Sequence, residues 1–149
     1  MLDKVEIQRI IKKITSSEYY EGNYGDCIDS ADSVLSGVDE AARKEVPKDY
    51  LDFLAFFGFG ELDPAFCIED GPVIYSSIYG REINGFESMY VFAGNSGETL
   101  YAFDSRNHWA IVELSAESDE LEVVATSFSE FILEKLKYLE GVVDWRAEN

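Results

Sequence analysis

The chain has 149 residues, enough for one domain with a single hydrophobic core. Hydrophobic residues make up 46% of it and aromatic residues 14%, a composition that excludes a disordered protein. Thirty acidic residues against 12 basic ones give a formal net charge of -18, which argues against direct binding to nucleic acid or to anionic membrane surfaces.

The first part of the chain predicts helices. Isoleucine spacing in residues 2–14 is that of an amphipathic helix. Further helical patterns cover residues 26–35, closed by Ser36-Gly37, and residues 38–45. The last of these ends at Val46-Pro47, because the residue before a proline avoids helical dihedral angles.

The stretch VPKDYLDFLAFFGFG predicts a helix buried in the core. Proline suits its first turn, and apolar side chains including Tyr50, Phe53 and Phe57 form one wide stripe. In a dinucleotide site the glycines follow a strand and begin a helix, so that amide groups meet the phosphate. Here Gly58 and Gly60 follow the helix. We therefore interpret them as a C-terminal cap and not as a phosphate site.

After residue 60 the hydrophobic period becomes that of strands. The predicted strands are residues 65–69, 73–78, 88–93, 99–104, 109–114 and 122–125. Short, turn-rich connections favour antiparallel pairing in a meander. A final helix is predicted from Ser127, which forms a capping box with Glu130, to Gly141. The expected fold class is α+β: a meander sheet of about five or six strands, covered on one face by the N-terminal helices and the C-terminal helix.

The acidic residues are unevenly distributed. From Asp49 to Glu134 there are 17 acidic residues and two basic ones, Arg81 and Arg106. Such a surface attracts basic partners over the Debye length, roughly 8–10 Å at physiological salt. The alternative interpretation is that the charge only keeps the protein in solution.

Three features bear on the cellular compartment. No apolar run approaches the length of a membrane span, and residues 1–13 alternate charged with aliphatic residues, so neither a spanning helix nor a signal peptide is expected. Cys27 and Cys67 lie far apart without C-x-x-C spacing, so we expect buried, reduced thiols. The expected compartment is the cytoplasm.

Residues that offer catalytic or metal chemistry also have structural interpretations. The only histidine, His108, follows Asp104-Ser105, but these residues crowd one turn, where they suit turn formation as well as a Ser-His-Asp triad. Asp63 and Glu69-Asp70 carry oxygen ligands for a hard cation, yet they match no EF-hand spacing. We expect no catalytic residue, metal or cofactor.

The candidate partner-binding residues are acids and tyrosines in predicted loops and at strand ends. Acids beside exposed tyrosines are typical of a surface for a basic protein, because tyrosine buries a large area at small entropic cost. For any single acid, plain solvation is the alternative. The candidates are Glu61, Asp63, Glu69, Asp70, Tyr75, Tyr79, Glu117, Asp119 and Glu120, the last three at the tip of a predicted hairpin.

Three segments follow one another in a distinctive order. They are VPKDYLDFL at residues 46–54 with Gly58 and Gly60, then FAGNSGETLYAFD at residues 92–104, and ATSFSEFI at residues 125–132. This order resembles the SUKH superfamily, and more narrowly its Smi/Knr-type branch, named after a yeast cell-wall regulator. The resemblance covers residues 38–133 of what we expect to be one domain, and residues 1–37 form an N-terminal helical extension.

The resemblance implies an α+β fold without a catalytic constellation. Bacterial members of the superfamily resemble immunity proteins that bind and neutralise polymorphic toxins, many of which are nucleases. That role agrees with the charge, because a nuclease presents a basic surface to its substrate. We therefore expect a non-enzymatic immunity protein that neutralises a basic toxin domain. The alternative is a regulatory scaffold or protein-interaction module like the yeast regulator.

Overall fold

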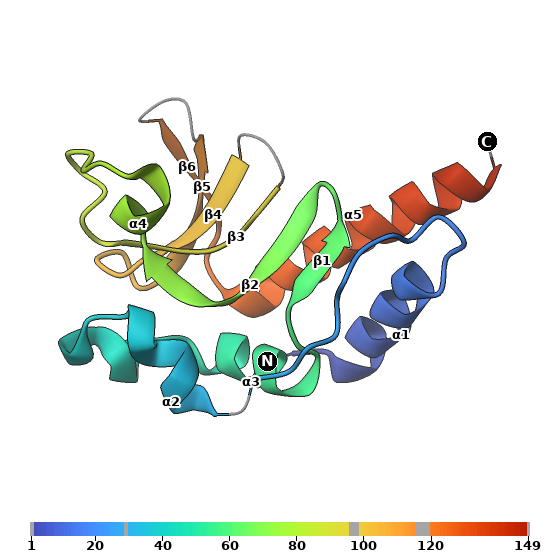
Figure 1. Ribbon diagram of the computed structural model, residues 1–149, viewed down its shortest axis with the longest axis horizontal. Helices are drawn as coiled ribbons and strands as arrows, with labels where there is room; N and C mark the ends of the chain where they lie inside the picture. The colour runs from blue at the N-terminus through green and yellow to red at the C-terminus, as the bar shows by residue number, and fades with distance from the viewer. Residues whose placement is uncertain (1, 29, 96–98, 116–119, 149) are drawn as a thin grey trace.

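The computed structural model describes residues 2–28, 30–95, 99–115 and 120–148 (Figure 1). In these residues one sheet of six antiparallel strands has the order β1-β2-β3-β4-β5-β6, so each strand pairs with the next along the chain. The strands are β1 (Gly60–Asp63), β2 (Phe66–Ile74), β3 (Met89–Gly94), β4 (Thr99–Asp104), β5 (Ala110–Ser115) and β6 (Leu121–Ala125). The predicted α+β fold with a meander sheet is confirmed.

Helices cover one face of this sheet, as Figure 1 shows. They are α1 (Lys4–Thr15), α2 (Ala31–Val34), α3 (Lys48–Phe56) and α5 (Phe128–Glu148), with 3₁₀ turns η1 (Leu35–Gly37) and η2 (Glu40–Glu45). A short helix, α4 (Tyr75–Tyr79), lies on the opposite face. The main core lies between the sheet and α1, α3 and α5. It draws on the buried stripe of each of these helices, the arrangement that their sequence spacing predicts.

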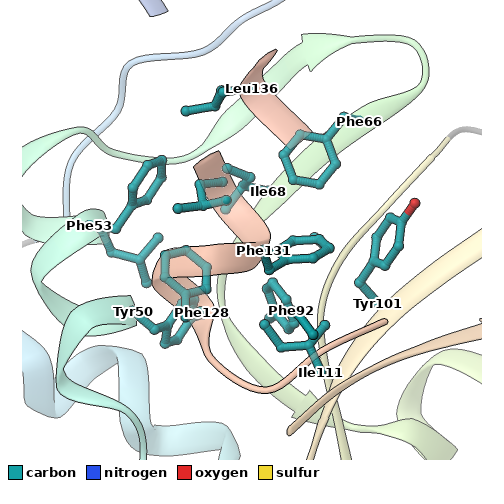
Figure 2. Packing of buried hydrophobic residues seen from close by; sticks show 14 of the residues in the cluster. Tyr50, Phe53, Phe66, Ile68, Phe92, Tyr101, Ile111, Phe128, Phe131 and Leu136 are labelled. Atoms are coloured by element: carbon teal, nitrogen blue, oxygen red, sulfur yellow. The ribbon is translucent and has the colours of Figure 1, made fainter. Parts of the chain in front are cut away.

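Aromatic rings form the centre of the main core (Figure 2). The Tyr50 ring on α3 makes edge contacts with Phe92, Phe103 and Phe128, at centroid distances of 5.6, 5.0 and 5.2 Å. Such pairs contribute about 0.5–1.5 kcal/mol each beyond their buried area. α3, the helix that precedes Gly58, is therefore a core helix, as its apolar stripe predicts.

The opposite face of the sheet has a smaller second core. Tyr75 from α4, with Ile83 and Phe86, packs there against side chains of β3, β4 and β5. The predicted strand 73–78 is therefore wrong in part: β2 ends at Ile74 and residues 75–79 are helical. The buried Tyr75 hydroxyl accepts a hydrogen bond from the Ile83 N–H (2.8 Å), and Gly80 ends the helix in the left-handed conformation.

Three predicted helices have different limits in the structure. A helix was predicted at residues 26–35, closed by Ser36-Gly37, but only residues 31–37 are helical. The helix begins after Ser30, because the Ser30 side chain caps it by accepting a hydrogen bond from the Ser33 N–H. Residues 40–45 form a 3₁₀ turn. The last helix does not end at Gly141 but continues to Glu148. Glycine ends a helix when its φ is positive, and Gly141 does not have a positive φ.

Candidate protein-binding groove

The segment around Gly58 and Gly60 packs against the tyrosine-rich loop that follows α1. Gly58 has φ +90° and its N–H donates to the Phe53 carbonyl, which confirms the cap. A Cβ at Gly58 would lie 2.6 Å from the Asp26 carbonyl oxygen, and one at Gly60 (φ +125°) 2.8 Å from that of Asn23. Both glycines are therefore required by backbone conformation and close approach.

Two tyrosines fix this loop against the strand. The Tyr20 hydroxyl donates to the Glu61 carbonyl (2.9 Å), and the Tyr24 hydroxyl donates to the Gly58 carbonyl (2.9 Å). The Asn23 side chain accepts from the Glu61 N–H (2.9 Å). Burial raises the pKa of Tyr24, so its hydroxyl remains a donor throughout the physiological range. These hydrogen bonds hold residues 20–24 against β1, where they form a wall beside the strand.

A groove of about 550 Å³ lies where this wall, the β1–β2 turn and the C-terminal end of α5 meet. Figure 1 shows the C-terminal end of α5, one of these three elements, at the end of the chain marked C. The groove is lined by Tyr19, Tyr20, Glu21, Gly22, Glu61, Leu62, Asp63, Pro64, Trp145 and Arg146. Two sequence-predicted acids, Glu61 and Asp63, are therefore brought together with a third, Glu21.

An ion pair closes one side of the groove. Arg146 Nη1 lies 3.1 Å from Asp63 Oδ2, while Asp63 Oδ1 accepts from the Ala65 N–H (3.0 Å). Asp63 is therefore held in place by two partners and neutralised by one. Glu21 and Glu61 form no ion pair with any described residue, so the groove carries uncompensated negative charge.

Two exposed aromatic side chains flank these acids. Trp145 is 64% exposed and Tyr19 is 54% exposed. The sequence interpretation missed both, because it ended the last helix at Gly141 and selected no candidate before Glu61. One signal predicts the extension: Val143 follows Leu139 by four residues, which continues the apolar stripe of α5, and both side chains pack on the main core.

A network at the surface anchors this end of α5 to α1. Arg9 Nη1 lies 2.6 Å from Glu140 Oε2, and Lys13 Nζ lies 3.2 Å from the same oxygen and 2.8 Å from Asp144 Oδ1. The hydrogen bond from Arg9, supported by that from Lys13, lowers the pKa of Glu140 to about 2. The helix that carries Trp145 is therefore held beside α1 by ion pairs.

Glu69 and Asp70 lie away from the groove. They follow the buried Ile68 in β2, where its register with β3 shifts. Asp70 lines a separate cavity of about 280 Å³ with Cys27. Burial and the charge of Asp70 together raise the pKa of Glu69.

The two tyrosine candidates are less exposed than predicted. Tyr75 is buried in the second core, so the expectation of an exposed tyrosine there is wrong: its ring lies between the sheet and the segment that follows α4. Tyr79 is half-buried, and its hydroxyl donates to the Ser115 carbonyl (2.9 Å). Glu120 lines a hollow that includes Ser115. Glu117 and Asp119 lie outside the described residues.

The residues with catalytic potential serve a turn. Asp104 accepts from the Ser88 hydroxyl (2.7 Å), and the Ser105 hydroxyl donates to the Ser88 carbonyl (2.9 Å). His108 is exposed in a left-handed conformation with φ 54°. The two side chains that a triad would direct at the histidine are therefore engaged with Ser88.

Neither cysteine is fully buried. The prediction of two buried thiols is wrong for Cys27, which is exposed because it follows the loop 20–26 on the surface. Cys67 is half-buried, and burial raises the pKa of its thiol. Within the described ranges, no three His, Cys, Asp or Glu side chains are grouped as metal ligands would be.

The sequence was also compared with known proteins. It matches no family model and no curated protein. Among the described residues, no helix has both the length and the apolar character of a membrane span.

Proposed function

We propose that this chain is a non-enzymatic immunity protein that binds a basic toxin domain through the groove beside β1, with a nuclease as the expected class of toxin. The observation that carries the proposal is the meeting of Glu21, Glu61 and Asp63 with two exposed aromatic side chains in that groove. The sequence resemblance to SUKH immunity proteins supports the same function.

The charge of the groove supports a basic partner. Two of its three carboxylates have no cationic partner among the described residues, and the chain as a whole has a formal net charge of -18. Long-range attraction of this kind raises association rates by about 10- to 1,000-fold at low ionic strength. A basic domain would therefore be drawn toward the protein before contact.

The aromatic residues supply what charge alone does not. Tryptophan and tyrosine are enriched among the residues that contribute most binding energy, because each buries a large area with few rotatable bonds. Trp145 and Tyr19 line the same groove as the acids. A lysine or arginine side chain that enters the groove therefore has both carboxylates and aromatic rings available to it.

The mechanism of neutralisation follows from the partner's chemistry. A nuclease must present basic residues to the phosphates of its substrate. A protein that covers those residues with carboxylates excludes the nucleic acid by competition, with no bond made or broken. This consequence separates an immunity protein from a regulatory module, which would bind its partner without abolishing an activity.

Coexpression tests the proposal. An immunity role requires a large secreted protein to be encoded beside this chain, and its C-terminal domain should be toxic alone and harmless when the chain is present. Glu61→Lys and Trp145→Ala should each weaken protection and pull-down, whereas Glu40→Lys, the same charge change on an exposed site outside the groove, should not. Absence of such a gene, or equal protection by all three variants, would contradict the proposal.

A further inference from the structure

β6 is an edge strand. Among the described residues it pairs with β5 on one side and with no strand on the other. Edge strands present alternate N–H and C=O groups without a strand partner, and natural proteins usually protect them. The other edge strand, β1, is covered in this way by the loop of residues 20–26. Residues 121–123 of β6 are exposed.

Two apolar rows of the sheet end at this edge with uncovered side chains. Leu121 lies opposite Leu114, and Val123 lies opposite Val112. Leu114 and Val112 are buried in the second core, but Leu121 is 43% exposed and Val123 is 49% exposed. A further strand beside β6 would cover both side chains by continuing the same rows.

The row between them, which faces α5, is acidic. Glu122 lies directly opposite Glu113, an arrangement of like charges that destabilises a strand pair. Neither carboxylate forms an ion pair with a described residue. Lys135 of α5 lines the same hollow as Glu113, but its ammonium donates to the Tyr101 hydroxyl (2.8 Å). A cation on the outer side of Glu122 would relieve this repulsion.

The charge argues against a second copy of this chain as the occupant. Pairing β6 with the β6 of a second copy would bring together two strands whose one charged residue is the acid Glu122, on two chains that each have a formal net charge of -18. A strand with basic side chains meets the opposite field. Charge complementarity therefore selects a basic partner.

We propose that β6 binds a β-strand of a partner protein in which apolar and basic residues alternate. The basic residue lies opposite Glu122, and apolar residues lie opposite Leu121 and Val123. Main-chain hydrogen bonds supply affinity, and the alternation supplies specificity. The inference goes beyond the proposed function, because its charge argument uses Glu113 and Glu122 and no residue of the groove.

The test uses the whole chain and a synthetic peptide of about nine residues in which valine and lysine alternate, the upper range of strand length. The peptide should bind at low ionic strength and slow amide hydrogen exchange in residues 121–125. Glu122→Lys should weaken its binding by about three- to tenfold and improve that of a valine–glutamate peptide. Glu82→Lys, an exposed site off the strand, is the control of equal charge and should change neither affinity by more than about twofold.

Several results would overturn the inference. The first two are the absence of binding, and slowed exchange in residues 60–64 without slowed exchange in β6. The others are an affinity for a peptide with valines and lysines in separate blocks that equals that for the alternating peptide, and a Glu82→Lys variant that weakens binding as much as Glu122→Lys does. A dimer of the chain that Leu121→Lys dissociates would also overturn it, in favour of a second copy. Glu61→Lys and Trp145→Ala should leave the relative affinities for these peptides unchanged, so failure here is distinguishable from failure of the groove proposal.

Discussion

The carboxylate of Asp49 accepts two hydrogen bonds from Ser129, one from its backbone N–H (2.9 Å) and one from its hydroxyl (2.6 Å). Asp49 lies in the first turn of α3 and Ser129 in the first turn of α5, 80 positions later. An acidic group at a helix N-terminus satisfies a free N–H and interacts favourably with the helix dipole. The contact therefore links the two helices that cover the centre of the sheet.

This contact predicts the effect of removing the Asp49 carboxylate. Asp49→Ala should lower the free energy of unfolding by about 1–3 kcal/mol, because it leaves the half-buried N–H and hydroxyl of Ser129 without their partner. Denaturation in urea measures the change. Asp52→Ala is the matched control: Asp52 lies on the same helix, its side chain bonds to no described residue, and its removal should cost less than about 0.5 kcal/mol. Equal losses in the two variants would show that the contact is not stabilising.

Glu140 predicts a dependence of stability on pH. Its pKa in the folded protein is about 2, below the ordinary value of 4.5, so it stabilises the fold above pH 4.5 and loses that contribution as the pH falls toward 2. Glu140→Gln should lower the free energy of unfolding by about 1 kcal/mol at neutral pH, and the difference from the original chain should shrink below pH 4.5.

The control for Glu140 is Glu134→Gln, which removes an exposed carboxylate of the same helix. It should have little effect at any pH. A Glu140→Gln penalty that stays constant from neutral pH to pH 3 would show that the loss comes from packing and not from the ion pairs with α1.

Glu69 predicts a pH dependence of opposite sign. Burial and the neighbouring Asp70 raise its pKa, so the contribution of Glu69 to stability is present below its unfolded pKa and is lost as the pH rises through the folded value. Glu69→Gln should therefore raise the melting temperature at pH 7 and leave it unchanged at pH 4. The gain will be small because the side chain is partly exposed. A lower melting temperature at pH 7 would rule out the repulsion between the two acids.

We expect the His108 side chain not to be required for the function of the protein. His108→Ala should leave partner binding and protection intact, because the neighbouring Asp104 and Ser105 are bonded to Ser88. Circular dichroism provides the check on folding. Loss of protection by a folded His108→Ala variant would favour an enzymatic function over a binding one.

The order of elements could be predicted from the sequence because local rules determine it. The stripe of α3 and its cap at Gly58 are local features, and the structure confirms them together with the meander order of the sheet. The break predicted between residues 69 and 73 is wrong, because it lies inside β2, and β1 was not predicted. Local rules failed where a distant contact decides the conformation. α4 forms because Tyr75 packs under Phe86 and bonds to Ile83, neither of which is near enough in sequence to enter a strand pattern.

The groove could be predicted only in part. Glu61 and Asp63 were selected for their charge, but their meeting with Trp145 depends on how far α5 continues and on its ion pairs with α1. Glu69 and Asp70 were selected by the same rule and lie elsewhere, because a sequence pattern does not tell which strand end faces which helix end.

A calorimetric titration of the whole chain with the basic toxin domain that the proposed function requires tests the central claim most directly. We expect the two proteins to bind at low ionic strength, and their affinity to fall at least about tenfold as the salt concentration reaches the physiological range. The Glu61→Lys substitution should lower the affinity further. Binding of the basic domain that neither salt nor the Glu61→Lys substitution changes, or no binding at all, would contradict it.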